Sequence, residues 1–180
     1  MAGASLAGAW AASRAFGARC QAGPGPAPRR LLRGRFDLSP WENAVNRTET
    51  EALIRGYFDA FNRGDAKGML ALLAPDVSHH VNQGEVREGI ERFRDFLDHM
   101  NETYREEARN LVVMATDDGA RAAAECTIRG TYLETDPGLP EANGQTYALP
   151  VGSFFEVAGG RIKRVTTYYN LQDWLRQVGA

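Results

Sequence analysis

Apolar residues recur at helical spacing in three stretches of the chain. The first stretch spans residues 48–65, and Thr48 with Glu51 fits a capping box at its start. A second, shorter helix is expected after Asp65, whose side chain can cap it. The third helix begins near Glu88, and its apolar residues follow one another at steps of three, four, three and four: Ile90, Phe93, Leu97, Met100 and Tyr104.

The rest of the chain alternates with a period of two, which is typical of strands with one buried face. Turn-forming glycines separate these segments, and a loop rich in proline, glycine and asparagine divides them into two hairpins. A short strand also lies between the second and third helices, and a short helix or tail closes the chain. The predicted strands are residues 76–81, 110–116, 121–133, 146–158 and 161–170.

Helices followed by antiparallel hairpins, rather than strictly alternating helices and strands, indicate an α+β fold. The three helices would cover one face of the sheet and leave an internal cavity between helices and sheet. The other face would be solvated or would form a dimer. We expect one domain at residues 46–180, preceded by a basic arm at residues 1–45.

The amino-terminal segment differs in composition from the rest. Residues 1–36 contain six arginines and no acidic residue, and because the whole chain has a net charge of −2, the remainder carries −8. The segment has too little bulky apolar content to offset its ordering entropy. We expect it to be a disordered arm, an over-long start with the real protein beginning near Trp41, or a mitochondrial or plastid transit peptide. The acidic remainder repels phosphates, so no nucleic acid partner is expected.

Cysteine usage and hydropathy bear on the compartment. Cys20 lies in the basic arm and Cys126 in the domain, so a disulfide within the domain is not available. This fits a reducing compartment, and a cytoplasmic location is expected. No apolar run reaches the length of a membrane span, so no membrane partner is expected either.

Several segments carry a resemblance to a known family, among them "YFDAFNRGDAKGMLALLAPDV", "GIERFRDFL" and "FFEVAGGRIKRVTTYYN". From Thr48 to Trp174 the chain resembles the nuclear transport factor 2-like superfamily, also called SnoaL-like. The pieces "NQG", "GTYL", "GLP" and "YYNLQDW" are most similar to bacterial ketosteroid isomerase-related proteins. The resemblance implies a cone-shaped, curved antiparallel sheet with helices across its mouth, and a homodimer formed through the outer sheet face.

The resemblance to true ketosteroid isomerases implies three catalytic positions. Their tyrosine, which donates a hydrogen bond to the substrate oxygen, matches Tyr57. Their general-base aspartate falls on Val81, and their second acid falls on Gly152 when counted back from "GRI". Without a base and a second donor the same isomerisation should lose most of its rate, so authentic steroid isomerase activity is not expected.

Two adjacent histidines occupy the strand expected at residues 76–81. If Val81 faces the cavity, strand alternation also turns His79 inward and turns His80 outward. A histidine with a pKa of about 6.5 is suited to proton transfer, and opposite the Tyr57 phenol it would form a catalytic pair. The alternative is a core histidine that bonds a backbone carbonyl.

Four further residues are candidates for substrate binding. Glu125 interrupts an apolar strand; facing inward it would be a buried carboxylate with a raised pKa, and facing outward it would pair with an arginine. Glu156 shares strand parity with Gly152 and is placed near the cavity rim. The resemblance implies a pocket aromatic at Tyr169, and Phe154 is expected in the core or pocket wall.

The expected function is cofactor-independent acid–base chemistry on a small apolar carbonyl or polyketide-like ligand, of isomerase, cyclase, dehydratase or hydrolase type. The alternative is a non-catalytic ligand-binding or dimeric scaffold with the same fold. No metal is expected, because the adjacent histidines point to opposite strand faces and no zinc-type spacing is present.

Overall fold

The computed structural model describes residues 46–82 and 84–179. The arm expected at residues 1–45 lies outside these residues, and so do the alternatives considered for it. No helix in the described part of the chain is both long enough and apolar enough to span a membrane.

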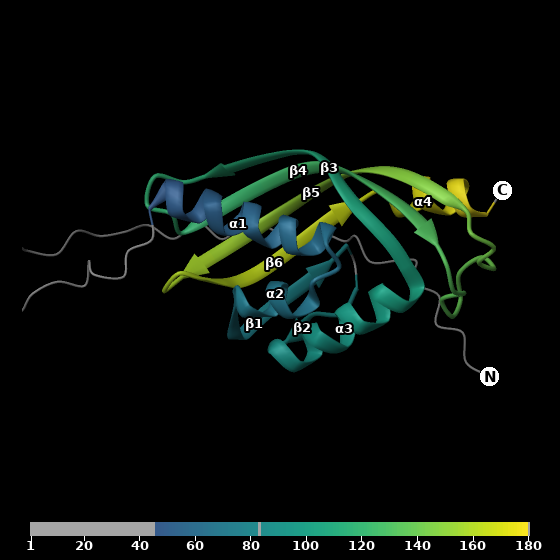
Figure 1. Cartoon of the computed structure of the whole chain (residues 1–180), viewed down its shortest axis with the longest axis horizontal. Helices are drawn as coiled ribbons and strands as arrows, with labels where there is room; N and C mark the ends of the chain where they lie inside the picture. Colours follow the sequence, from purple (N-terminus) through teal and green to yellow (C-terminus); the bar gives the residue numbers. More distant parts are fainter. Residues whose placement is uncertain (1–45, 83, 180) are drawn as a thin grey trace, which may run out of the picture. The chain divides into compact units, whose positions relative to one another are not determined.

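The described domain contains helices and strands in the predicted order, with a short additional strand before the third helix (Figure 1). The final segment is a helix. The elements are α1 (Arg47–Asn62), α2 (Ala66–Ala71), β1 (Leu73–Val81), β2 (Arg87–Glu88), α3 (Ile90–Thr103), β3 (Tyr104–Ala115), β4 (Arg121–Tyr132), β5 (Thr146–Ala158), β6 (Arg161–Tyr169) and α4 (Leu171–Val178).

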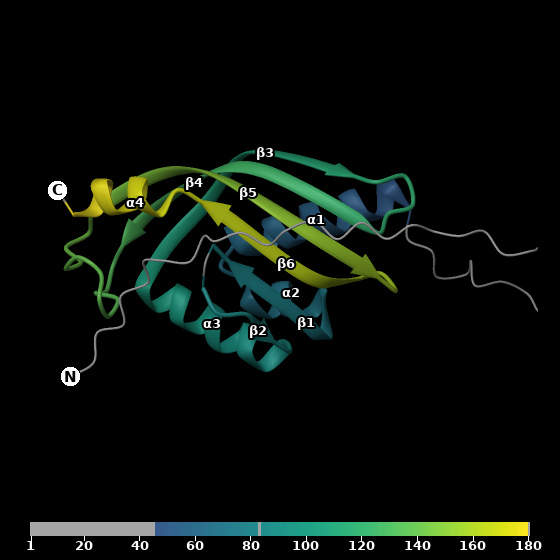
Figure 2. The same cartoon turned by 180° about the vertical axis from the view of Figure 1, so that it is seen from behind.

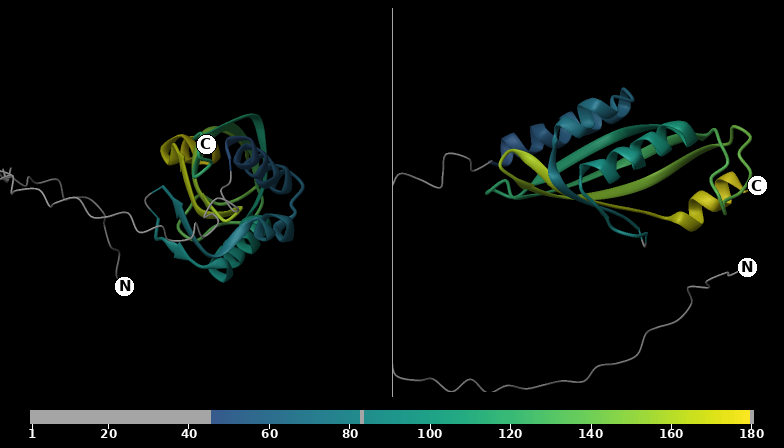
Figure 3. Two further views of the ribbon diagram at one scale, coloured as in Figure 1. Left: turned by 90° about the vertical axis from the view of Figure 1, so that its left-hand side faces the viewer. Right: turned by 90° about the horizontal axis from the view of Figure 1, so that it is seen from below.

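The strands form one curved sheet in the order β2-β1-β6-β5-β4-β3. Neighbouring strands pair antiparallel, except that β1 runs parallel to β6. Helices α1, α2 and α3 lie on one side of the sheet, as the front and back views show (Figures 1 and 2). Seen from its end, the sheet curls toward these helices (Figure 3). The predicted α+β cone is therefore confirmed, with one parallel pair within it.

The start of α1 differs in detail from the prediction. Asn46 is the N-cap: its side chain accepts a hydrogen bond from the Glu49 backbone N–H, and the Glu49 carboxylate accepts one from the Asn46 N–H. The capping box is thus this pair rather than Thr48 with Glu51. Asparagine is at least as good an N-cap as threonine, so the earlier start costs nothing.

The first half of β3 was not predicted. Helix α3 passes directly into the strand at Tyr104, which had been assigned to the helical stripe, and the strand had been expected to begin at Asn110. The β3–β4 register shifts between Arg109 and Val112, and Asn110 has a positive φ of 56°. This bulge interrupts the alternation, and the residues before it are largely charged, so their strand pattern is hidden in the sequence.

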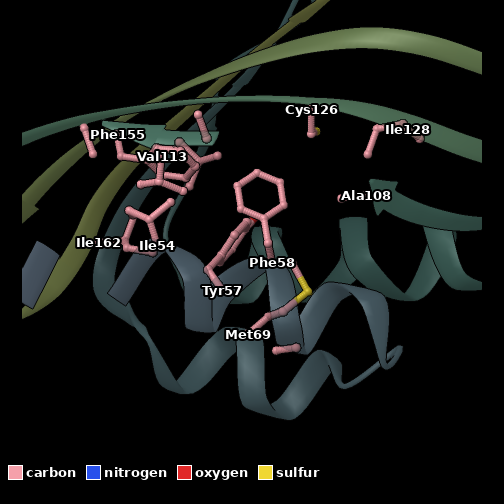
Figure 4. Close-up of a cluster of buried hydrophobic side chains, with 14 of the residues drawn as sticks. Ile54, Tyr57, Phe58, Met69, Ala108, Val113, Cys126, Ile128, Phe155 and Ile162 are labelled. Atoms are coloured by element: carbon pink, nitrogen blue, oxygen red, sulfur yellow. The ribbon is translucent and has the colours of Figure 1, made fainter. Parts of the chain in front are cut away.

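The core lies between α1 and the inner face of the sheet (Figure 4). The rings of Tyr57, Phe58 and Phe155 meet edge to face, with centroids 5.6 to 6.2 Å apart. Phe155, Val157 and Val165 are at most 6% exposed and belong to this core.

Candidate functional site

A cavity of about 810 Å³ opens between the helices and the inner face of the sheet. This size is within the range of small-molecule sites, which are typically apolar with a few polar groups. Polar side chains reach the cavity from β1, β2, β3, β5, β6 and the loop after β4. Its apolar wall includes Phe58, Phe61, Phe96, Leu97, Leu149 and Trp174.

His79 lies on β1 and points into this cavity, while His80 lies on the opposite strand face. The His79 side chain is 3% exposed, and its ring centroid lies 4.4 Å from that of Phe93 and 4.5 Å from that of Phe96. Its Nδ1 atom is buried and bonds no described residue. Burial, reinforced by the positive charge of Arg87, lowers the pKa of His79 to about 3. The imidazole is therefore neutral at physiological pH.

Tyr57 lines the same cavity from α1. The side chain is 8% exposed, and burial raises the pKa of its phenol above the ordinary value. The phenol thus stays protonated and can donate a hydrogen bond. The structure brings Tyr57 and His79 to one cavity, and their catalytic role stays a prediction.

Glu106 on β3 places a carboxylate in the cavity. The hydroxyl of Tyr147 on β5 donates a hydrogen bond of 2.6 Å to its Oε1. Between them in the sheet lies Gly130 on β4, which pairs with both residues. A β-carbon on Gly130 would overlap the Tyr147 ring, so the glycine provides the space for this bond. Burial raises the pKa of Glu106, and the hydrogen bond from Tyr147 opposes that rise.

A second polar group lies where α3 meets β3. Oδ2 of Asp136 accepts a hydrogen bond of 3.0 Å from the Tyr104 hydroxyl. The same oxygen lies 3.2 Å from Nε2 of His99. The Asp136 backbone N–H donates to the Tyr132 hydroxyl at 2.7 Å. These contacts tie the end of α3 to the loop that follows β4. His99 is thus part of the cavity lining.

Three of the predicted substrate-binding residues do not line the cavity. Glu125 is exposed between two buried residues of β4, so it takes the outward alternative, although no arginine pairs with it among the described residues. Phe154 is 49% exposed on the outer face. Glu156 also lies outside and forms ion pairs with Arg121 and Arg164. The reason is parity, because the inward positions of β5 are the odd-numbered ones.

The same parity excludes Gly152 from the cavity and replaces it with Ser153. Gly152 pairs with Glu125 on the outer face, whereas Ser153 is 4% exposed and lines the cavity. In β6 the register with β5 shifts beside Lys163, which inserts an extra residue. This bulge turns Tyr169 inward, so that Tyr169 lines the cavity, and its role in ligand binding stays a prediction.

Sequence reasoning missed Glu106, Tyr147 and Asp136. Glu106 fell in a segment that was not recognised as a strand, and Asp136 fell in a loop. Tyr147 lies at an inward position of a correctly predicted strand, so alternation alone could have identified it. Within the described part of the chain, no three His, Cys, Asp or Glu side chains are arranged to hold a metal ion.

Comparison with known proteins agrees with this architecture. Residues 54–165 match the SnoaL-like domain family. The crystal structure of a provisionally assigned polyketide cyclase from Xanthomonas campestris pv. campestris is 53% identical with a TM-score of 0.72, over 73% of this chain and 98% of that one. Another from Silicibacter sp. TM1040 is 55% identical with a TM-score of 0.73, over 76% and 99% of the two chains.

More distant structures share the fold alone. An epoxide hydrolase of M. tuberculosis is 20% identical with a TM-score of 0.60, and the alignment covers 73% of this chain and 90% of that one. A comparison with curated protein sequences finds no significant match.

Proposed function

Because the chain belongs to the SnoaL-like domain family, we propose that it binds a small apolar carbonyl or polyketide-like ligand in the cavity and transforms it by acid–base chemistry without a cofactor. The reaction would be of isomerase, cyclase, dehydratase or hydrolase type. Support comes from the apolar wall with a few convergent polar groups, and from relatives at 53% and 55% identity that are provisionally assigned as polyketide cyclases.

The observation that carries the proposal is the bond between Glu106 and Tyr147 inside the cavity. A carboxylate whose pKa is raised by burial is a stronger base than an exposed one, and a base works best when its pKa lies near the operating pH. Glu106 is therefore the group that would take a proton from a carbon next to the ligand carbonyl. The Tyr147 hydroxyl would hold the carboxylate in place.

Tyr57 and His79 would serve the ligand oxygen rather than the proton transfer. A phenol with a raised pKa remains a donor, and it would stabilise negative charge that develops on a carbonyl oxygen. His79 is too weakly basic for a general base at neutral pH, but a neutral imidazole can still donate or accept one hydrogen bond. Tyr169 would shape the wall beside them.

The second candidate is a non-catalytic scaffold with the same fold, whose function would lie in its homodimer rather than in turnover. Large apolar side chains lie exposed on the outer sheet face, and the rings of Phe154 and Tyr168 stack edge to face there with centroids 6.1 Å apart. Val112 and Met114 are also about half exposed on β3. Such a face is suited to a homodimer, which we propose for both candidates.

Proton abstraction can be tested before the natural substrate is known. The protein is incubated in deuterated buffer with 2-tetralone, an apolar ketone with acidic α-protons, and exchange is followed by NMR. We expect catalysed exchange that falls by about 10²-fold or more in Glu106→Gln, the usual contribution of a positioned general base.

The matched control is Glu107→Gln, because Glu107 is the neighbouring carboxylate on β3, does not line the cavity and pairs with Arg109 at 2.8 Å. It should leave the exchange rate unchanged. Equal rates in the wild-type chain and Glu106→Gln would exclude Glu106 as the base. The absence of catalysed exchange with a series of apolar ketones would favour the scaffold.

A further inference from the structure

An arginine that forms no ion pair with the described residues lines the cavity. Arg87 is half of the two-residue strand β2, and the register of β1 and β2 pairs it directly with His79. Its guanidinium carbon lies 4.8 Å from the centroid of the Phe96 ring. The His79 imidazole, the Phe96 ring and Arg87 all line the cavity. The cation is thus held against an aromatic wall and beside a neutral imidazole.

The guanidinium is incompletely satisfied. Its Nη1 atom is buried and makes no hydrogen bond with any described residue, and no carboxylate among them forms an ion pair with Arg87. The adjacent acid, Glu88, accepts a hydrogen bond from Ser78 at 3.0 Å. A buried donor without a partner is costly, although the Arg87 side chain as a whole is only half-buried. The contact with Phe96 recovers only part of that cost.

His79 adds a second unsatisfied atom at the same place. Its buried Nδ1 bonds no described residue, and the two side chains sit on paired positions of neighbouring strands. The positive charge of Arg87 acts on His79 strongly enough to help keep it neutral. One charged donor and one neutral ring nitrogen therefore lie together where β1 and β2 line the cavity.

We propose that Arg87 and His79 form a carboxylate-binding subsite, and that the ligand is an apolar carbonyl compound that carries a carboxylate. This inference rests on the proposed function. A guanidinium matches a planar carboxylate with two parallel hydrogen bonds. One positive charge beside a neutral imidazole balances a monoanion, whereas a phosphate dianion would retain excess negative charge. The carboxylate would anchor the ligand at β1 and β2, and Glu106 would act from β3, at the other edge of the sheet.

The subsite can be tested by binding alone, with two probes of the same shape. Naphthalene-2-carboxylate and its neutral counterpart naphthalene-2-carboxamide are titrated into the protein by calorimetry at pH 7. We expect the carboxylate to bind about tenfold or more tightly, because a hydrogen bond to a charged group contributes more than a neutral one. Arg87→Gln should abolish this preference, and Arg87→Lys should retain part of it.

Arg105→Gln is the matched control. Arg105 also lines the cavity, but its side chain is exposed and lies on β3. If any arginine in the cavity could bind the carboxylate, Arg105→Gln would weaken the preference for the carboxylate as much as Arg87→Gln does. We expect Arg105→Gln to change this preference little. The melting temperature of each variant shows whether it is folded. If Arg87→Gln does not fold, Arg87→Lys takes its place, and its preference for the carboxylate should be smaller than that of the wild-type chain.

The outcomes separate the subsite from the proposed function. If both probes bind the wild-type chain with equal affinity, the carboxylate subsite is wrong while the apolar cavity stands. If Arg105→Gln removes the preference and Arg87→Gln does not, the subsite is also wrong. If neither probe binds, both the subsite and the apolar-ligand proposal are contradicted.

Discussion

Tyr147 and Glu106 are joined by a 2.6 Å hydrogen bond although they belong to strands that are not neighbours. The Tyr147 ring crosses β4 at the one place where that strand has no side chain, Gly130. The position of the carboxylate in the cavity thus depends on a glycine that itself carries no functional group.

Gly130→Ala should displace the Tyr147 ring. We expect a loss of about 1–3 kcal/mol in the free energy of unfolding, the usual cost of overpacking, together with reduced ketone exchange. Urea unfolding measures the first effect and NMR exchange the second. Gly152→Ala is the control, because a β-carbon there would meet nothing within 4 Å. Equal stability of the two variants would show that the ring can move aside freely.

Glu106→Gln should stabilise the protein at alkaline pH while it lowers activity. Because the pKa of Glu106 is raised in the folded state, folding favours the protonated carboxyl, and stability is lost as pH rises through the window between the unfolded and folded pKa values. Glutamine avoids this loss and still accepts the Tyr147 hydrogen bond. Urea unfolding at pH 8 and pH 4 should show the larger gain at pH 8. A gain of the same size in Glu107→Gln would contradict this cause.

His79 should make the protein sensitive to acid. Its pKa is about 3 in the folded state, below the ordinary value of 6.5, so the unfolded chain binds a proton that the folded chain does not. The His79 contribution is intact above pH 6.5 and is lost as pH falls toward 3. Between pH 6.5 and pH 5 this amounts to about 2 kcal/mol. Between these two pH values, the free energy of unfolding of His79→Gln should fall by about 2 kcal/mol less than that of the wild-type chain. Urea unfolding at pH 6.5 and pH 5 measures this difference.

His80→Gln provides the comparison for that measurement. His80 occupies the next position of β1 on the opposite strand face and is only half-buried. We expect its acid sensitivity to match that of the wild-type chain. If both variants behave alike, the pH dependence does not come from the inward histidine.

The outer sheet face should hold a homodimer together. Phe154 and Tyr168 are each about half exposed there, so Phe154→Arg would place a charge in the middle of the contact. Sedimentation should show a dimer for the wild-type chain at micromolar concentration and a shift toward monomer for the variant. A wild-type chain that sediments as a monomer would refute this arrangement.

Regular spacing of apolar residues made most helices and strands predictable from the sequence. The prediction failed where the backbone is irregular. The apolar stripes of α1 and α3 and the alternation of β4 and β5 are regular, so their positions follow from spacing. The parity of β1 likewise placed His79 inward. The bulge near Asn110 concealed half of β3 and with it Glu106. The pattern within a single strand cannot reveal that Gly130 on β4 makes room for a hydrogen bond between its two neighbouring strands, β3 and β5.

The pairing of β1 with β6 also determines when the cavity can exist during synthesis. β1 is the first long strand to be made, but its parallel partner is the last strand of the sheet. During synthesis, the strands that carry His79 and Arg87 can join the rest of the sheet only after β6 has emerged from the ribosome, when almost the whole chain has been made. Until then the nascent chain exposes an unpaired strand edge, which is a site for misassociation. A stop codon before β6 would therefore remove the cavity, and not only its last wall.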